Sequence, residues 1–559
     1  MTDNRQAAPQ GRDHEAFPTL TERQLEQVKR FGHVESLPEG TVLFERGERS
    51  VDFYVVLEGR VEIYDYACDG TPTTITVHGE SQFTGEIDLF SDRKILVGGR
   101  MAEDGQVIRV PRAQFRELLA AEPGVGEVVM RAFVLRRIGL LESNMGAAVL
   151  LGRRTDAATL RIRAFLRRNG YPVKVLYVDE DDKAREYAEQ QGASDDDLPL
   201  LMCAGEEPLK SPTDLEVAQT VGLVEWPSSD RVYDLAVIGA GPGGMAAAVY
   251  GASEGLDTVV LERSAPGGQA GTSSKIENYL GFPNGLSGQE LAGRAQVQAQ
   301  KFGATLALPM TVTAIEGEEP PYAIQLAEHD PVRCRSIVIA TGATYRTLDV
   351  DNYEDFEGRG IYYAATAIEG GLCEGEEVVV VGGGNSAGQA AVFLASRAKH
   401  VHMLVRGEEL AASMSDYLIR RINASDAISL CCETTITRLE GKGSLERITW
   451  HDRKTDQETT HDIGRLFLMI GAKPNTSWIG QSLMADDRGF LKTGSDVVEA
   501  QRWKLERPPE PFETSLPNVF AIGDARCKSV KRVASAVGEG SVCIQSVHRV
   551  LSAAAADNG

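Results

Sequence analysis

Two glycine-rich turns in the sequence have the spacing that binds dinucleotides. In the first, YDLAVIGAGPGGMAAAVYGASEGLDTVVLER, a strand pattern leads into Gly239, Gly241 and Gly244, and a helical pattern and a second strand pattern ending in Glu262 follow. The first glycine makes a tight turn, the second lets backbone approach a pyrophosphate, and the third lets the helix pack close to the strand. The acid would bind ribose hydroxyls, so the sequence predicts a dinucleotide site here.

The second turn lies in EVVVVGGGNSAGQAAVFLASRAKHVHMLVRG. Its second strand pattern ends in Arg406 with no acid to accept ribose hydroxyls, and an arginine at this place favours a 2′-phosphate. Two dinucleotide sites in one chain imply electron transfer between two cofactors, and we expect NADPH at the second. The residues expected to bind it are Gly382, Gly384, Asn385, Ser386, Ala387 and Arg406.

The cysteines do not form a redox pair in the sequence. They are Cys68, Cys203, Cys334, Cys373, Cys431, Cys432, Cys527 and Cys543. No two have the C-x-x-C spacing of the common dithiol motif, and no zinc-type Cys/His spacing occurs, so no metal site is expected. Cys431 and Cys432 are adjacent in a strand pattern, which would point them to opposite faces, and we interpret both as structural thiols.

A family resemblance rests on four further segments, which read APGGQAGTSSKIENYLGFP, SIVIATGATYR, FLMIGAKPNTSW and NVFAIGDARCKSVKRVASAVGEGS. With the two turns, they make residues 231–559 resemble the low-molecular-weight thioredoxin reductases, class II pyridine nucleotide-disulfide oxidoreductases. The resemblance implies an FAD domain in two pieces, an inserted NADPH domain and a homodimer. It implies FAD contacts at Gly239, Gly241, Gly244, Glu262, Arg263, Gly268, Gln269, Asn278, Thr341, Gly342, Gly523, Asp524, Arg532, Val533 and Ala534.

The stretch GIYYAATAIEG departs from that family at its reactive centre. Ala364 and Ala367 stand where the family has the two cysteines of its redox dithiol. That dithiol receives electrons from the flavin and passes them to a protein disulfide through a thiolate, which alanine cannot do. Hydride transfer from NADPH to FAD needs none of the missing atoms. Two smaller departures are Gly407, where a second basic residue would hold the 2′-phosphate, and Gln389, which replaces a usual Glu.

The sequence therefore favours an FAD-dependent NADPH oxidoreductase whose acceptor is not a C-x-x-C-relayed disulfide. A quinone, an iron–sulfur protein, another flavin or dioxygen could take the electrons of a reduced flavin. Two alternatives stay open. One is a non-catalytic redox or nucleotide sensor on this scaffold, and the other is a true thioredoxin-disulfide reductase that uses Cys373 or the pair Cys431 and Cys432.

The N-terminal block reads as short strand patterns followed by helical patterns, which predicts a small β-roll. Its order and the turn FTGEIDLF resemble a cyclic-nucleotide-binding domain, which implies that Glu86 would hold the ribose hydroxyl. Where that family has the arginine that neutralises the cyclic phosphate, this sequence has Ile95 and Leu96. Arg93 or Lys94 could supply the charge after a local shift, but we interpret the domain as nucleotide-free.

The middle block alternates helix and strand patterns in the order of a thioredoxin-like or glutaredoxin-like unit, and Leu198–Pro199 falls where those folds have a cis-proline. The chemistry of that fold needs a thiolate at the N-terminus of the first helix. No cysteine lies between Cys68 and Cys203, so we expect a structural or docking role.

The predicted fold is a multidomain α/β chain: a β-roll, a thioredoxin-like α/β unit and a flavoprotein fold with two dinucleotide-binding domains. The domains are expected at residues 18–150, 153–225, 231–345, 346–473 and 474–559. The net charge of −23 over 559 residues argues against nucleic-acid and anionic membrane partners. The sequence has neither a secretory signal pattern nor a stretch of about 18 uninterrupted apolar residues, so the cytoplasm is expected.

Overall fold

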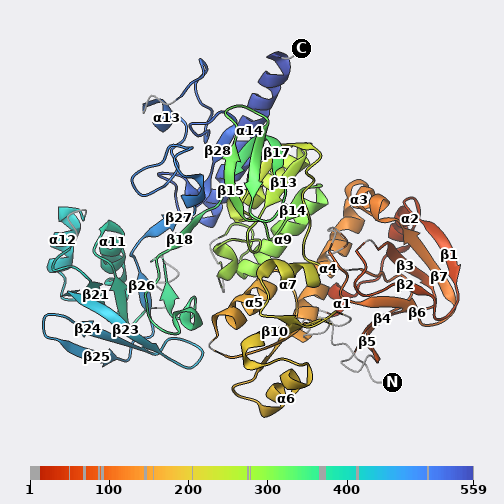
Figure 1. Ribbon diagram of the computed structural model, residues 1–559, viewed down its shortest axis with the longest axis horizontal. Coiled ribbons are helices and arrows are strands. Elements are labelled where there is room, and N and C mark those ends of the chain that lie inside the picture. Colours follow the sequence, from red (N-terminus) through yellow and green to blue (C-terminus); the bar gives the residue numbers. More distant parts are fainter. Residues whose placement is uncertain are drawn as a thin grey trace.

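The computed structural model arranges the chain in four units (Figure 1). It describes residues 13–49, 51–66, 71–85, 89, 93–143, 148–154, 156–203, 206–273, 276, 279–363, 365, 373–410, 414–499 and 503–557. In Figure 1 the N-terminal unit lies at the right, the second at the bottom centre, the third above it and the fourth at the left. None of the described helices is both long enough and apolar enough to span a membrane.

The first unit is a β-roll of two sheets, as predicted. Its strands are β1 (His33–Leu37), β2 (Val42–Phe44), β3 (Phe53–Glu58), β4 (Val61–Tyr66), β5 (Pro72–His78), β6 (Gly98–Met101) and β7 (Gly105–Val110). They pair in the orders β1-β7-β3 and β2-β6-β4-β5. The helices are α1 (Asp13–Ala16), α2 (Glu22–Lys29), α3 (Arg112–Ala121) and α4 (Pro123–Ser143). Phe53 packs against Phe115 and Phe133 at ring-centroid distances of 4.7 and 6.4 Å, which joins β3 to both α3 and α4.

The second unit has the strand order of a thioredoxin fold, β11-β10-β8-β9, in which β8 and β9 are parallel and β10 is antiparallel to both its neighbours. Its elements are β8 (Ala148–Gly152), α5 (Ala157–Arg168), β9 (Val173–Tyr177), α6 (Asp182–Gln190), η2 (Asp195–Asp197), β10 (Leu200–Met202), β11 (Leu209–Lys210) and α7 (Asp214–Thr220). The peptide bond Leu198–Pro199 is cis, as expected. Strand β8 was not predicted, because its short apolar run directly follows a helical pattern. The boundary expected between residues 150 and 153 would therefore cut through this sheet.

The third unit, here called the first dinucleotide domain, is a sheet built from two separate parts of the chain. Its strands run in the order β14-β13-β12-β17-β16-β15, and β28 pairs with β17 in parallel. They are β12 (Val232–Ile238), β13 (Thr258–Leu261), β14 (Thr305–Ala307), β15 (Val312–Glu316), β16 (Tyr322–Leu326), β17 (Val332–Ile339) and β28 (Val519–Ala521). The main helices are α8 (Pro242–Ser253), α9 (Gly288–Lys301) and α14 (Val533–Asp557). Strands β12 and β13 are almost wholly buried, which is typical of a parallel sheet covered on both faces.

The fourth unit, the second dinucleotide domain, is inserted into the third. A parallel sheet runs in the order β19-β26-β20-β21-β22, and β23, β24 and β25 form a separate antiparallel sheet. The elements are β19 (Ile361–Tyr362), β20 (Glu377–Val381), α11 (Asn385–Leu394), β21 (His400–Val405), α12 (Asp416–Asn423), β22 (Ile428–Cys432), β23 (Thr434–Glu440), β24 (Arg447–Asp452), β25 (Gln457–His461) and β26 (Leu466–Leu468). The chain enters through β18 (Ala343–Tyr345) and leaves through β27 (Ala472–Pro474), and these two strands pair antiparallel. Both connections therefore run side by side.

Candidate functional site

The first glycine-rich turn joins the end of β12 to the start of α8. Gly239 has a φ of +103°, and a Cβ there would lie 2.6 Å from the carbonyl oxygen of Ala340. A Cβ on Gly244 would lie only 1.9 Å from the carbonyl oxygen of Gly239. A Cβ on Gly241, the N-cap of α8, would have its nearest neighbour at 4.0 Å. The outer glycines are thus required by sterics, and the middle one leaves an open face at a helix N-terminus, where anions bind.

Glu262 follows β13 and fixes the loops around this turn. Its carboxylate accepts hydrogen bonds from the backbone N–H groups of Ala240 at 2.7 Å and Ser264 at 2.8 Å. The next loop is tied to the same turn, because Gly267 N–H donates to the carbonyl oxygen of Ala240 at 2.7 Å. A ribose contact by Glu262 stays a prediction. The neighbouring side chains of Arg263 and Gln269 are exposed.

Gly268 and Thr341 give this cradle two further features. A Cβ on Gly268, where φ is +54°, would lie 3.1 Å from Gly241 Cα, so the two glycine segments touch. At the end of β17, Asn475 holds the carbonyl oxygens of Thr341 and Gly342, each at 3.0 Å. Among the described residues, the buried Thr341 hydroxyl has no hydrogen-bond partner. An orphaned buried hydroxyl beside an open cradle fits a site that a bound cofactor completes.

The C-terminal part of the chain supplies Asp524 and the start of α14. Asp524 lies in η6 (Gly523–Ala525), and burial raises the pKa of its carboxyl group, an effect that Lys531 opposes and Glu539 reinforces. The same Glu539 accepts a hydrogen bond from Gly523 N–H at 2.7 Å and so fixes η6.

Helices α14 and α8 begin side by side. A Cβ on Gly243 would lie 3.1 Å from the carbonyl oxygen of Ala536, and one on Gly540 would lie 2.4 Å from that of Gly243. Arg532, Val533 and Ala534 stand at the start of α14, where the side chains of Arg532 and Ala534 are exposed. The first turn of α8 thus packs against residues 536–540 of α14, close to the start of that helix.

The second glycine-rich turn joins the end of β20 to the start of α11 and resembles the first at its first glycine. Gly382 has a φ of +140°, and a Cβ there would lie 2.6 Å from the carbonyl oxygen of Met469. Gly384 is the N-cap of α11, and Ala387 is fully buried. Asn385 Oδ1 accepts hydrogen bonds from the backbone N–H and the hydroxyl of Ser415, at 2.7 and 2.9 Å. The side chain of Ser386 is exposed.

Arg406 lies at the exposed end of β21, and a second arginine lies beside it. The guanidinium of Arg453, in the turn between β24 and β25, donates a hydrogen bond to the carbonyl oxygen of Arg406. Sequence reasoning missed Arg453 and treated Arg406 as almost alone. Arg453 stands 47 residues further along the chain and in a different sheet, so no local motif could indicate it.

Four of the expected site residues lie outside the described residues: Glu86, Asn278, Ala364 and Ala367. The segment that leads to Ala364 is described, and Tyr363 fixes its start. The ring of Tyr363 stacks on Tyr345 of β18 at 4.6 Å, and its hydroxyl donates to Glu357 at 2.7 Å. The backbone just before the AATA stretch is thus held against the connection between the two dinucleotide domains.

None of the seven described cysteines forms a disulfide bond. Burial raises the pKa of six of them, to about 11 for Cys203. Cys431 and Cys432 lie on β22, as predicted, and Cys373 is fully buried. In the thioredoxin-fold unit, the first helix is capped by Asp156, whose side chain accepts from Thr159 N–H, rather than by a thiol. The described residues contain no group of His, Cys, Asp and Glu that could hold a metal ion.

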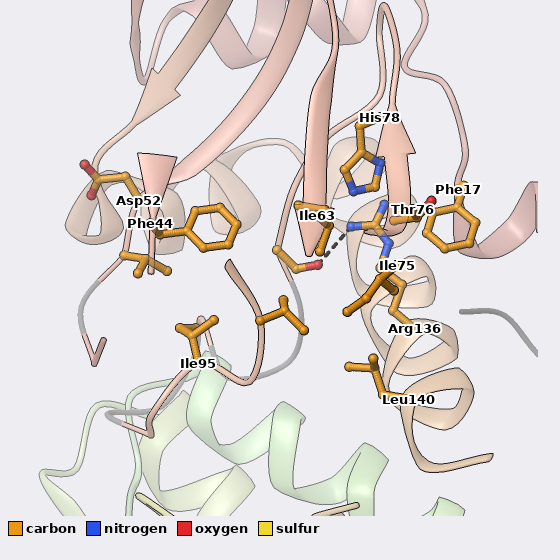
Figure 2. Close-up of a pocket in the computed structure, with 13 residues that line it drawn as sticks. Phe17, Phe44, Asp52, Ile63, Ile75, Thr76, His78, Ile95, Arg136 and Leu140 are labelled. Carbon is orange, nitrogen blue, oxygen red and sulfur yellow. Dashed lines mark hydrogen bonds between the residues drawn. The ribbon is translucent and has the colours of Figure 1, made fainter. Parts of the chain in front are cut away.

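The β-roll holds a small cavity of about 50 Å³, shown in Figure 2. Most of its lining is apolar, and Ile95 is part of the wall. Neither proposed source of positive charge is free for an anion there. Arg93 is buried and donates to the carbonyl oxygen of Asn169 at 3.4 Å, and Lys94 pairs with Glu206 at 2.8 Å, both in the thioredoxin-fold unit.

Two glycine-rich βαβ turns, in two sheets joined by a pair of strands, define a two-dinucleotide flavoprotein fold. Residues 233–540 match the model of the Pyridine nucleotide-disulphide oxidoreductase family, and the chain belongs to that family. Residues 34–122 match the model of the Cyclic nucleotide-binding domain. Neither match includes residues 123–232.

Several similar proteins are thioredoxin reductases. The chain is 32% identical to "Thioredoxin reductase" of Bacillus subtilis over 325 residues, 58% of this chain and 96% of the relative. It is 33% identical to "NADPH-dependent thioredoxin reductase 3" of Arabidopsis thaliana, over 57% of this chain and 59% of the relative. The solved thioredoxin reductase of Streptococcus pyogenes matches with a TM-score of 0.51 and 30% identity, over 58% of this chain and 99% of that one. The chain is thus a thioredoxin reductase-like oxidoreductase.

The sterics of the first turn generate a prediction. Gly244→Ala should lower the thermal stability of the protein strongly. The new Cβ would collide with the backbone carbonyl oxygen of Gly239, and backbone cannot move aside as the end of a flexible side chain can. Gly293→Ala is the matched control, since Gly293 is also a helical glycine and has nothing within 4 Å of its Cβ position. Calorimetric unfolding of both variants tests this. Equal transition temperatures for the two would contradict the close contact.

Proposed function

We propose that the protein is an FAD-dependent NADPH oxidoreductase that passes electrons to an acceptor other than a C-x-x-C-relayed disulfide. One contrast carries the proposal. Both glycine-rich cradles keep the residues that dinucleotides need, while the sequence has AATA in place of the family dithiol. Bound FAD would supply the capacity to accept a hydride and to release the electrons again. The acceptor is a small molecule or a carrier protein.

The described residues would hold FAD in one cradle and NADPH in the other. In this proposal the N-termini of α8 and α14, the Thr341 hydroxyl and the Asp524 carboxylate would hold FAD. The open N-terminus of α11 would hold the NADPH pyrophosphate, and Arg406 and Arg453 would hold its 2′-phosphate. We further propose a homodimer, as is typical of thioredoxin reductases, and a cytoplasmic location stays a prediction.

The state of the described thiols supports an acceptor other than a disulfide. Disulfide exchange needs a thiolate, and burial raises the pKa of every described cysteine for which a shift is resolved. At neutral pH these groups are protonated thiols. This also disfavours a disulfide reductase that uses the pair Cys431 and Cys432.

Electron counting is the test of the proposal. Anaerobic titration with NADPH should reduce the protein with uptake of two electrons per chain, because FAD alone holds them. An alkylating agent should leave NADPH oxidation with ferricyanide or a small quinone nearly unchanged. A colourless protein that takes up no added FAD, uptake of four electrons, or loss of activity on alkylation would each overturn the proposal.

A matched variant supports the titration. The double substitution Ala364→Cys with Ala367→Cys restores the C-x-x-C spacing and should raise the uptake to four electrons if the new pair forms a disulfide. The wild-type protein, measured alongside, should stop at two. Reduction of a thioredoxin disulfide should be poor in the wild type.

The arginine pair predicts the preference between the two nicotinamide coenzymes. Arg406→Ala should raise the KM for NADPH about ten- to a hundredfold and leave that for NADH almost unchanged, because a charge-assisted phosphate contact contributes about 1.5–3 kcal/mol. Arg453→Ala should also raise the KM for NADPH relative to the KM for NADH. Arg447→Ala, which removes an exposed arginine of β24 that pairs with Glu440, is the control. If the two KM values rise together, the 2′-phosphate is held elsewhere.

The β-roll should bind cyclic AMP and cyclic GMP weakly or not at all. Its cavity of about 50 Å³ is smaller than the cavity of about 150 Å³ that holds one benzene molecule. Ile95 and Leu96, at the place of the phosphate-binding arginine, are buried in the core. Titration calorimetry of the full chain with either nucleotide measures this, and affinity in the low micromolar range or better would contradict it.

A further inference from the structure

The end of α5 and the turn that follows it, residues 167–170, contact the wall of the proposed FAD cradle. Asn169, which is buried, donates through Nδ2 to the carbonyl oxygen of Ser264 at 3.0 Å. Arg168 donates to the carbonyl oxygen of Gly268 at 3.3 Å. Gly268 is the glycine that touches Gly241 at the open face of the cradle. The thioredoxin-fold unit thus holds two carbonyl groups of the loop that closes one side of this site.

The same turn contacts the β-roll through its own carbonyl groups. Arg93 donates to the carbonyl oxygen of Asn169 at 3.4 Å, and Arg137 of α4 donates to that of Gly170 at 3.2 Å. Both arginines are buried. A buried guanidinium that loses a hydrogen bond is costly, so these contacts fix the turn to the β-roll.

The β-roll segment that makes this contact also forms the wall of the cavity. Ile95 lines the cavity and stands two residues after Arg93, and its backbone is held by Glu48 and Gly47 through hydrogen bonds of 2.8 and 2.9 Å. Between them, Lys94 N–H donates to the carbonyl oxygen of Gly222 at 3.2 Å. Two residues of extended chain span only about 7 Å, so Ile95 cannot move far without moving Arg93.

We propose that residues 167–170 are a coupling element between the β-roll cavity and the FAD site. Asn169 is a positioning residue. Its side chain fixes the Ser264–Gly268 loop, and its backbone carbonyl moves with the Arg93–Ile95 segment because Arg93 is hydrogen-bonded to it. A change at the cavity wall is thereby transmitted to the flavin. The inference rests on the proposed FAD function of the cradle.

The first arm of the test measures flavin binding by the full chain. Asn169→Leu should weaken FAD affinity about tenfold and change the visible circular dichroism of the bound flavin, because the carbonyl of Ser264 loses its donor. Arg168→Met removes only the contact to Gly268 and should act in the same direction, which keeps the test valid if Asn169→Leu does not fold. Arg163→Met is the control, since Arg163 lies on α5 but contacts Tyr177 within its own unit.

The second arm measures coupling by a double-mutant cycle. Ile95→Phe adds a ring at the cavity wall. It should change FAD affinity about fivefold in the otherwise wild-type protein, and hardly at all in a protein that already carries Arg168→Met or Asn169→Leu. Ile75→Phe alters the opposite wall, on β5, and should have a smaller effect. Equal effects of Ile95→Phe in both backgrounds, or none in either, would overturn the coupling. A wild type without FAD would overturn the proposed function itself.

Discussion

The close packing of α8 on the end of β12 is the contact on which the first dinucleotide domain depends. Because no side-chain atom fits between Gly244 and the carbonyl oxygen of Gly239, the helix N-terminus stands directly over the turn. Helix α14 then packs on α8 through Gly243 and Gly540, which brings η6 and Asp524 from the far end of the chain to the same place. Two pieces of sequence thus form one cradle through close contacts between backbones, and the side chains of Glu262 and Glu539 fix its loops.

The second dinucleotide domain also has a glycine-rich turn between a strand and a helix, but its charges differ. Its first glycine, Gly382, has a backbone contact like that of Gly239, but Ala387 takes the place of Gly244, and an exposed arginine replaces the acid at the end of the second strand. The two domains are connected by β18 and β27, which pair with each other, and Tyr345 of β18 stacks on Tyr363. In the proposed reaction the electron acceptor would react with the flavin directly, since the sequence has no dithiol of family spacing to carry electrons away.

The thioredoxin-fold unit keeps the architecture of a redox domain but uses its first helix differently. At the start of α5, where a reactive thiol would be stabilised by the helix dipole, the carboxylate of Asp156 accepts the N–H of Thr159. Although burial alone would raise it, the hydrogen bonds from Thr159 lower the pKa of this carboxyl group. The end of the same helix carries the contacts to both neighbouring units. The surfaces of this domain therefore serve packing between units, which explains how it can lack the cysteines and keep the fold.

The sequence by itself determined the features that lie within one stretch of chain: both glycine-rich turns, the β-roll order, the β22 strand and the missing dithiol spacing. Each depends on neighbours a few residues apart, where sterics and periodicity are strong. The strand β8 was missed because a five-residue apolar run beside a helical pattern has no distinctive period. Only the tertiary structure decided that Arg453 joins Arg406, that Arg93 and Lys94 face the thioredoxin-fold unit, and that Asn169 holds Ser264. These contacts join residues 47 to 112 positions apart. They exist only because elements far apart in the sequence pack against one another, and the first three units share one hydrophobic core.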